Sequence, residues 1–261
     1  MIMKKIVKKF LSKLNLSTYG VVEKKKLLEI INLLRPLDLG YNYIRLGGKT
    51  DGSYIVPEIL DEIKYCFSAG YGGDCSFEKD LEKHNIKSFL ADYSFDAPTE
   101  LKNFEYSKKF IKSFSNQKSI DINSWIEKPI SLEEKKMILQ IDIEGSEYEV
   151  LHSISEKNLR RFDILIIEMH NLFMLNNQIF YKYFLSCIEK IKNSFEVFYL
   201  QPNNCCGTSN FDGVIFPNIL EITFLNKSKV NQKEQFKNKN KNLFVKNIDY
   251  KEEIILPDYW Y

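Results

Sequence analysis

Short apolar runs alternate with stretches of helical periodicity over most of the chain, starting near residue 62. Each run has the length of a buried strand, and the stretches between runs suit crossover helices. The predicted strands are Tyr65–Ala69, Ser88–Asp92, Met137–Asp142, Ile164–Met169, Val197–Gln201 and Glu221–Leu225. The pattern therefore predicts an α/β fold with a mostly parallel sheet.

Helical spacing of apolar residues identifies three segments between these strands. One runs from Gly73 to His84, a second begins at Ser146, and a third covers residues 179–193. Residues 1–35 also show a helical pattern among lysines, which Pro36 ends. We expect this basic start to pack on the domain or on the partner in a homodimer; contact with an anionic membrane is the alternative.

The pattern changes again after residue 228. Residues 229–242 are polar and low in complexity, which predicts a loop. Residues 256–261 are rich in aromatic side chains, so we expect them to pack on the body or on a second subunit. The chain is thus interpreted as an N-terminal helical extension (1–40), a central domain (41–228) and a C-terminal extension (229–261).

Composition narrows the class of protein. A chain of 261 residues, 44% of them hydrophobic, can bury one substantial core. Its 37 basic and 35 acidic residues argue against a nucleic-acid partner. No apolar stretch reaches the roughly 18–20 residues that span a bilayer, and no secretory signal follows the N-terminal lysines. Five cysteines without metal-type spacing predict reduced thiols in a cytoplasmic protein.

A glycine-rich turn, Gly70-Tyr71-Gly72-Gly73-Asp74, follows the first predicted strand. Glycines allow a sharp turn and a close approach to a ligand, and open α/β sheets bind ligands beyond the carboxyl ends of strands. Asp92 ends the next strand, at a spacing typical of acids that accept hydrogen bonds from ribose. Together these features predict a nucleoside-containing cofactor; a plain turn and a surface acid are the structural alternatives.

Two further strand ends carry titratable side chains in pairs. Asp142 and Glu144 end the third strand, and Glu168 and His170 end the fourth. Alternation along a strand places the members of each pair on one face. Carboxylates at a strand end are costly unless they bind something. We therefore expect both pairs to lie side by side at one edge of the sheet and to carry the chemistry.

Residues 141–148, Ile-Asp-Ile-Glu-Gly-Ser-Glu-Tyr, resemble the signature of the FkbM-type methyltransferases. Further segments share the resemblance in the same order: Arg45-Leu46-Gly47, Asp51-Gly52-Ser53-Tyr54, Gly70–Glu78, Glu168-Met169-His170, Asn203-Asn204-Cys205 and Leu220-Glu221-Ile222-Thr223. The resemblance covers about residues 43–226. It implies a class I, Rossmann-like methyltransferase fold with a seven-stranded sheet, S-adenosylmethionine as cofactor, and methylation of hydroxyl oxygens.

The resemblance assigns the cofactor to the glycine turn and its surroundings. The cofactor-binding residues would be Gly70, Tyr71, Gly72, Asp74, Glu78, Asp92 and Asp142. Many class I enzymes have an acid two positions before the first glycine, where this chain has Ser68. Asp74 or Glu78 would then supply the missing acid.

His170 is the predicted general base, because a neutral imidazole has a suitable pKa near pH 7. Glu168 would orient it, with Asp142 beside it. A second version of the mechanism places a divalent ion, Mg²⁺ or Mn²⁺, on Asp142, Glu168 and His170, where it would hold the acceptor and lower the pKa of its hydroxyl.

The acceptor side is assigned to Arg45, Asp51, Tyr54, Glu144, Asn203 and Asn204. The first three precede the first strand and would form a flap; a salt-bridged turn is the alternative for Arg45 and Asp51. The predicted acceptor is a sugar, free or nucleotide-linked, in the synthesis of a bacterial capsule or other surface polysaccharide. A nicotinamide-dependent oxidoreductase and a non-catalytic nucleoside-binding module are the competing classes.

Overall fold

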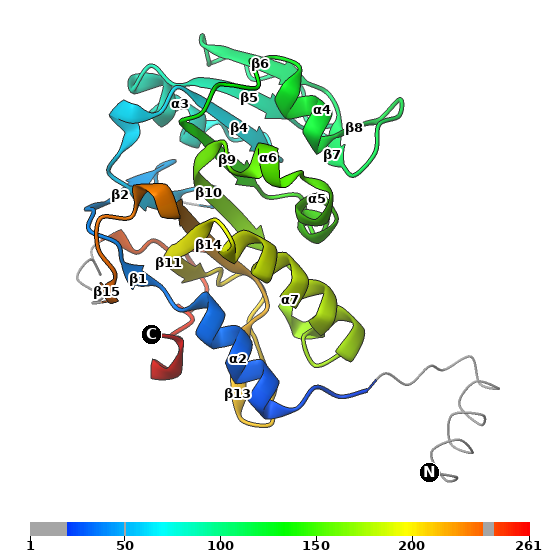
Figure 1. The fold of residues 1–261 in the computed structure, drawn as a ribbon, viewed down its shortest axis with the longest axis vertical. Helices are drawn as coiled ribbons and strands as arrows, with labels where there is room; N and C mark the ends of the chain where they lie inside the picture. The colour runs from blue at the N-terminus through cyan, green and yellow to red at the C-terminus, as the bar shows by residue number, and fades with distance from the viewer. Residues whose placement is uncertain (1–19, 50, 237–242) are drawn as a thin grey trace, which may run out of the picture.

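The computed structural model describes residues 20–49, 51–236 and 243–261 (Figure 1). Seven strands form one sheet in the order β11-β14-β10-β9-β4-β5-β6. Their bounds are β4 Tyr65–Ala69, β5 Lys87–Ala91, β6 Phe104–Ser107, β9 Met137–Ile141, β10 Phe162–Met169, β11 Phe195–Pro202 and β14 Leu220–Asn226. β14 is antiparallel to both of its neighbours, and the other pairs are parallel. The predicted α/β fold with a mostly parallel seven-stranded sheet is confirmed.

Successive side chains of the central strands point to opposite faces of the sheet and pack into two apolar layers. Phe67 and Leu139 join one cluster, and Cys66 and Ile138 join the other, as the two-residue period of a strand requires. The first layer is covered by four helices: α2 Lys24–Leu34, α4 Ile122–Glu127, α5 Glu147–Ser153 and α7 Gln178–Lys192. The second is covered by α3 Ser76–Lys83 and a hairpin of β2 Tyr43–Leu46 and β3 Tyr54–Pro57.

The helices after Gly73, at Ser146 and at 179–193 are found as α3, α5 and α7, with ends shifted by a few residues. The prediction of one helix over residues 1–35 is wrong at residues 20–23, which are not helical. Val21 there pairs with Asn177 in an isolated bridge, so the helix begins at Lys24. Residues 1–19 lie outside the described residues.

Several small elements complete the fold. Short strands pair as β1 Leu37–Asp38 with β15 Glu234–Gln235, β7 Phe110–Lys112 with β8 Ser119–Asp121, and β12 Thr208–Phe211 with β13 Val214–Pro217. Further short helices within the described ranges are α6 Glu156–Leu159, η1 Leu60–Glu62, η2 Leu172–Met174, η3 Lys227–Lys229 and η5 Asp258–Trp260. Within the described ranges, no helix is both long and apolar enough to cross a membrane.

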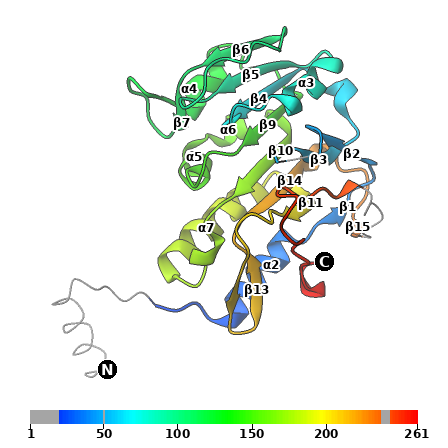
Figure 2. The ribbon, with the colours of Figure 1, turned by 180° about the vertical axis from the view of Figure 1, so that it is seen from behind.

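The C-terminal segment returns to the body of the molecule. The loop predicted for 229–242 contains β15 in its described part, and residues 237–242 lie outside the described residues. Residues 243–261 pass beside β11 and β14 (Figure 2). Trp260 is fully buried, packs edge-on against Phe216 and donates its indole N–H to the carbonyl oxygen of Ile215 at 3.0 Å. The aromatic end therefore packs on the body.

The prediction of reduced cysteines holds for three of the five. Cys66, Cys75 and Cys187 are buried free thiols. The prediction is wrong for Cys205 and Cys206, which form a disulfide. The two cysteines are adjacent in the turn after β11, so no second element is needed to bring their sulfur atoms together.

Candidate active site

The glycine turn lies at the carboxyl end of β4, against the end of β9. Gly70 has a φ of 82°, and a Cβ built on it would overlap the carbonyl oxygen of Asp142. Its amide donates to the carbonyl oxygen of Ala91 at 2.9 Å. Only glycine permits this conformation and this approach. The turn thus brings the ends of β4, β5 and β9 together.

Asp92 follows β5, and its carboxylate closes the same turn. Oδ2 accepts the amide hydrogen of Gly72 at 3.2 Å, and Oδ1 accepts that of Ser94 at 2.7 Å. Asp92 also lines a cavity of about 370 Å³, together with Gly70 and Gly72. The structure therefore places this acid where a ligand over the turn would meet it, and its contact with ribose stays a prediction.

The walls of this cavity are largely apolar. Five apolar side chains line it: Ala91, Phe95, Phe110, Ile111 and Ile143. Phe95 and Phe110 are 45% and 41% exposed, so both keep open ring surface. A flat apolar base beside a polar ribose is the kind of ligand that such a cavity suits. Sequence reasoning missed Phe95, Phe110 and Ile111 because they come from a loop and a three-residue strand with no motif of their own. Ile143 lies within the run 141–148 but was not assigned to the site.

A second cavity of about 240 Å³ adjoins the first and shares Gly70, Gly72 and Asp142 with it. Its lining is mostly polar and includes Asp51, Tyr54, Ser68, Tyr71, Asp74, Glu78 and Gln140. The residues assigned to the cofactor from the sequence therefore divide between an apolar and a polar compartment on either side of the glycine turn.

Glu78 reaches from α3 to Ser68, the position where an acid was missing. The Ser68 hydroxyl lies 2.5 Å from Glu78 Oε1 and 2.9 Å from Gln140 Oε1. One hydroxyl hydrogen cannot serve both oxygens, so a protonated Glu78 would complete the pattern. Burial raises the pKa of Glu78 to about 7. Its other oxygen, Oε2, has no hydrogen-bond partner among the described residues.

Two other residues assigned to the cofactor are engaged elsewhere. Asp74 is exposed, and its Oδ1 accepts the amide hydrogen of Ser76 at the start of α3 at 2.8 Å. The Tyr71 hydroxyl donates to the carbonyl oxygen of Asp96. Glu78 is thus better placed than Asp74 to act as the missing acid.

His170 follows β10 and is hydrogen-bonded to a carboxylate that was not assigned to the site from the sequence. Its Nδ1 lies 3.0 Å from Oε1 of Glu147, which is fully buried at the start of α5. The same oxygen accepts the amide hydrogens of Ile143 and Gly145 at 3.1 and 3.0 Å. Glu147 therefore fixes both the imidazole and the turn after β9. The motif contained this residue, but only the tertiary structure shows its partner.

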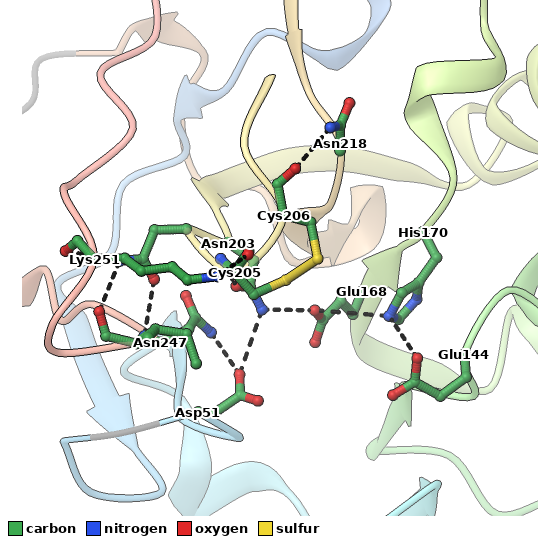
Figure 3. The surroundings of a disulfide bond; sticks show 12 residues. Asp51, Glu144, Glu168, His170, Asn203, Cys205, Cys206, Asn218, Asn247 and Lys251 are labelled. Carbon is green, nitrogen blue, oxygen red and sulfur yellow. Dashed lines mark hydrogen bonds and ion pairs between the residues drawn. A yellow bond between two sulfur atoms is a disulfide. The ribbon is translucent and has the colours of Figure 1, made fainter. Parts of the chain in front are cut away.

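The other ring nitrogen of His170 faces the predicted site. Nε2 lies 3.5 Å from Glu144, 3.9 Å from Glu168 and 4.0 Å from Asp142 (Figure 3). Burial would lower the pKa of His170, but the hydrogen bond and charge of Glu147, with the nearby Asp142 and Glu144, raise it above its ordinary value. The imidazole is thus a stronger base than a free histidine.

β9 ends at Ile141, one residue earlier than predicted, so Asp142 and Glu144 lie in the following turn rather than on a strand face. Glu144 has a φ of 56°, and its side chain is 88% exposed. Asp142 is hydrogen-bonded to Glu168, and burial raises the pKa of both carboxyls. One proton shared between the two would relieve their repulsion.

Asn203 lies between Asp51 and Glu168 (Figure 3). The Asn203 amide donates to Glu168 at 2.8 Å and to Asp51 at 3.4 Å. Asn247, from the C-terminal segment, donates to Asp51 at 2.7 Å and to Glu221 at 2.5 Å. Sequence reasoning missed Asn247 because it lies in a segment expected to be an appendage.

Arg45 turns its guanidinium into the protein. Nε donates to the carbonyl oxygen of Leu243 at 2.5 Å, Nη1 to Ser53, and Nη2 to Gln201 at 2.7 Å. The alternative salt bridge is not among these bonds, and contact with an acceptor stays a prediction. Arg45 joins the β2–β3 hairpin to β11 and the C-terminal segment.

Asn204 and Tyr54 also bond to the protein. The Asn204 amide donates to three carbonyl oxygens of residues 248–252, and its oxygen accepts the amide hydrogen of Ile248 at 2.8 Å. The buried Tyr54 hydroxyl accepts from Gln140 at 3.1 Å. Of the six residues assigned to the acceptor, Glu144 contacts His170, and Asp51 and Asn203 are connected to Glu168 by the Asn203 amide.

Two groups of described side chains have ligand atoms close enough to share a metal ion. They are Asp142 with Glu147 and His170, and Asp51 with Glu168 and Glu221. The set predicted from the sequence, Asp142 with Glu168 and His170, coincides with neither group, although Nε2 of His170 lies within 4.0 Å of both carboxylates. Glu147 already holds Nδ1 of His170, so only Nε2 remains for an ion.

Known proteins resemble this chain to different degrees. A methyltransferase from Streptococcus mutans, named as dependent on S-adenosylmethionine, is 12% identical with a TM-score of 0.40, and the match covers 71% of this chain and 55% of that one. The fibrillarin pre-rRNA processing protein of Methanococcus jannaschii is also 12% identical, with a TM-score of 0.38, covering 80% and 88%. The chain spans about half the length of the first of these. No curated protein matches it.

One protein family matches most of the central part of the chain. The methyltransferase FkbM domain matches residues 45–204, which hold the glycine turn, the Asp142–Glu147 run, His170 and Asn203. This range is more than half of the chain and ends at the turn after β11. The chain therefore belongs to the FkbM methyltransferase family.

Proposed function

We propose that this protein transfers a methyl group from S-adenosylmethionine to a hydroxyl oxygen of a sugar or another small polar acceptor. The observation that supports this most strongly is the geometry of His170. Its Nδ1 is held by Glu147, and its Nε2 is turned towards Asp142 and Glu144, which line the cavity over the glycine turn.

The two adjoining cavities fit the cofactor by their chemistry. The apolar walls around Phe110 and Ile111, with Asp92, suit the adenosine. The polar compartment beyond Gly70 suits the methionine portion, and the orphaned Oε2 of Glu78 is an acceptor for its ammonium group. When bound there, S-adenosylmethionine supplies a methyl group activated by a sulfonium.

His170 would act as the general base. With a carboxylate at Nδ1, the neutral ring carries its hydrogen there and keeps the Nε2 lone pair for the acceptor hydroxyl. The ring takes the hydroxyl proton as the oxygen attacks, and Glu147 balances the positive charge that forms. Positioning the oxygen within about 3–3.5 Å of the methyl carbon supplies much of the remaining rate.

Calorimetry and mass spectrometry test the proposal. S-adenosylmethionine and its demethylated product should bind, whereas NAD should not. A panel of free and nucleotide-linked sugars should yield one product whose mass has grown by a methyl group in place of a hydrogen. Tight binding of NAD alone would favour the oxidoreductase, and binding of S-adenosylmethionine without transfer to any acceptor would favour a binding module.

The pKa of His170 gives a first expected result. Because Glu147 raises this pKa, the ring should titrate above the ordinary value of about 6.5. The neutral base then accumulates as pH rises through that higher value, so kcat should rise with pH there. Glu147→Gln removes the charge and leaves the burial, and it should lower the pKa. NMR titration of the three histidines measures this directly; an unmoved His170 titration would contradict the pairing.

Glu78 gives a second expected result. Its carboxyl has a pKa of about 7, and only the ionised form attracts the ammonium of the cofactor strongly. Affinity for S-adenosylmethionine should therefore rise between about pH 6 and 8. Glu78→Gln should weaken binding about tenfold or more, the usual effect of losing a charged hydrogen bond, and should flatten the pH dependence. Asp74→Asn is the matched control, and a larger loss there would assign the ammonium to Asp74.

A divalent ion remains the second version of the mechanism. The oxygen-rich groups around Asp142 and Asp51 are what Mg²⁺ or Mn²⁺ prefers, and a bound ion would lower the pKa of the acceptor hydroxyl. Under this version, turnover should vanish on thorough chelation with EDTA and return with Mg²⁺ or Mn²⁺. Under the base mechanism alone, it should be unchanged.

A further inference from the structure

The disulfide between Cys205 and Cys206 lies in the turn after β11 (Figure 3). A disulfide stabilises a fold chiefly by closing a loop, and its contribution grows with loop length. A bond between adjacent residues closes no loop of the chain and joins no two elements. Its contribution to stability is therefore small, and its position next to the site suggests another role.

The two cysteines of this disulfide are also more accessible to solvent than the other three cysteines. Cys206 is exposed and Cys205 is half-buried. Cys66, Cys75 and Cys187 are at most 6% exposed. Because thiol–disulfide exchange requires a thiolate to approach a sulfur atom, an external thiol reaches this pair and not the other three cysteines.

The same turn orients Asn203. The amide hydrogen of Cys205 is donated to Asn203 Oδ1 at 2.9 Å, while Nδ2 of Asn203 donates to Glu168 and Asp51. A side-chain amide has one accepting end and one donating end. The Cys205 amide therefore fixes which end faces the carboxylates, and Asn203 links the cysteine pair to Glu168, beside His170.

The carbonyl oxygens of the pair are held as well. Lys251 donates to the Cys205 oxygen at 2.6 Å, and Asn218 donates to the Cys206 oxygen at 2.7 Å. These bonds come from the C-terminal segment and from the turn before β14 (Figure 3). The backbone at the pair is thus anchored from two sides, and the disulfide is its one covalent restraint that can be reversed.

We propose that Cys205 and Cys206 form a thiol–disulfide exchange site that controls the acceptor half of the active site (Asp51, Glu168, His170 and Asn203) through Asn203. The cofactor half, around Gly70, Glu78 and Asp92, shares none of the contacts of the pair and stays unchanged. The link to acceptor binding rests on the proposed function; the exchange chemistry and its effect on Asn203 do not.

The reaction consumes one dithiol reductant. A thiolate of the reductant attacks the exposed Cys206 sulfur, the bond between the two protein sulfurs breaks, and Cys205 leaves as a thiolate that takes up a proton. The second thiol of the reductant then displaces Cys206, which is also protonated. The protein gains two electrons and two protons, and the reductant becomes a disulfide. Once the ring is open, the backbone torsions on either side of the Cys205 Cα relax, so the Asn204–Cys205 peptide, whose N–H donates to Asn203, can rotate and release the Asn203 amide.

The test uses the full chain, air-oxidised or treated with dithiothreitol and labelled with [¹⁵N]cysteine. Iodoacetamide should modify no cysteine of the oxidised folded protein and two of the reduced protein. The Cys205 amide should exchange its hydrogen about tenfold faster after reduction, because it loses the Asn203 acceptor. Cys206→Ser should exchange its Cys205 amide as fast as the reduced form under both conditions, and it should be alkylated at one cysteine, Cys205. Cys75→Ser, the matched control, should behave like the wild type.

Asn203→Ala separates the proposed link from a general loosening. Its Cys205 amide should exchange fast in both redox states, while affinity for S-adenosylmethionine should differ by less than about twofold among all forms. Equal Cys205 exchange in oxidised and reduced wild type, two reactive thiols without reductant, or a cofactor affinity that falls on reduction would each overturn the proposal. Failure of every form to bind S-adenosylmethionine would instead contradict the proposed function, and the thiol and exchange results would still stand.

Discussion

Replacing His170 with alanine is expected to lower kcat by about 10²- to 10⁴-fold, the range that general-base catalysis usually supplies. The affinity for S-adenosylmethionine should be unchanged, because Nε2 faces Asp142 and Glu144 while the cofactor contacts lie around the glycine turn. Single-turnover methyl transfer and calorimetry on the same preparation measure the two quantities separately.

His152→Ala is the matched control. His152 hydrogen-bonds Ser186 at 3.0 Å and stacks on Tyr183, away from both cavities. Its loss should leave kcat unaffected. If His170→Ala turned over at the wild-type rate, His170 would not be the base. If it lost the cofactor as well, its role would be structural.

Gly70→Ala is expected to abolish cofactor binding and to lower the free energy of unfolding by about 3 kcal/mol. The new Cβ would overlap the carbonyl oxygen of Asp142, and overpacking typically costs about 1–3 kcal/mol. A φ of 82° adds left-handed strain of about 1–2 kcal/mol. Urea unfolding and calorimetry with S-adenosylmethionine are the measurements.

Gly72→Ala separates strain from overlap. Gly72 also has a positive φ, of 64°, but a Cβ there meets nothing within 4 Å. It should cost only the left-handed strain of about 1–2 kcal/mol. Equal stability losses in the two variants would show that the approach of Gly70 to Asp142 is not needed.

The sheet was predictable where its strands are buried on both faces. β4 was found at its bounds, and β9 and β10 were found because continuous apolar runs mark buried parallel strands. β6, an edge strand, was missed because Phe104–Ser107 is only partly buried and lacks such a run. The β2–β3 hairpin was missed because its strands have four residues each and pack by tertiary contact.

The candidate site was predictable as a set of strand ends, but not as a set of contacts. The sequence pattern predicted that Asp142, Glu168 and His170 lie at one edge of the sheet, because parallel strands end together. It assigned the orienting carboxylate to Glu168, whereas Glu147 from the following helix makes that hydrogen bond. Arg45 was assigned to the acceptor because no local pattern reveals that two of its partners, Gln201 and Leu243, lie 156 and 198 positions away in the sequence.

The attachment of Arg45 to Leu243 has a consequence for rebuilding this protein. Arg45 is half-buried, and a cation withdrawn from solvent that loses its acceptors is costly, so the hairpin and the C-terminal segment can be exchanged between relatives only as a matched pair. The glycine turn takes no part in that attachment. A chimera that transplants both pieces together, with Asp51 and Tyr54 retained because they line the polar cavity, would change the surroundings of Asn247 and keep the glycine turn and the apolar cavity. Such a chimera offers a practical route to new acceptors.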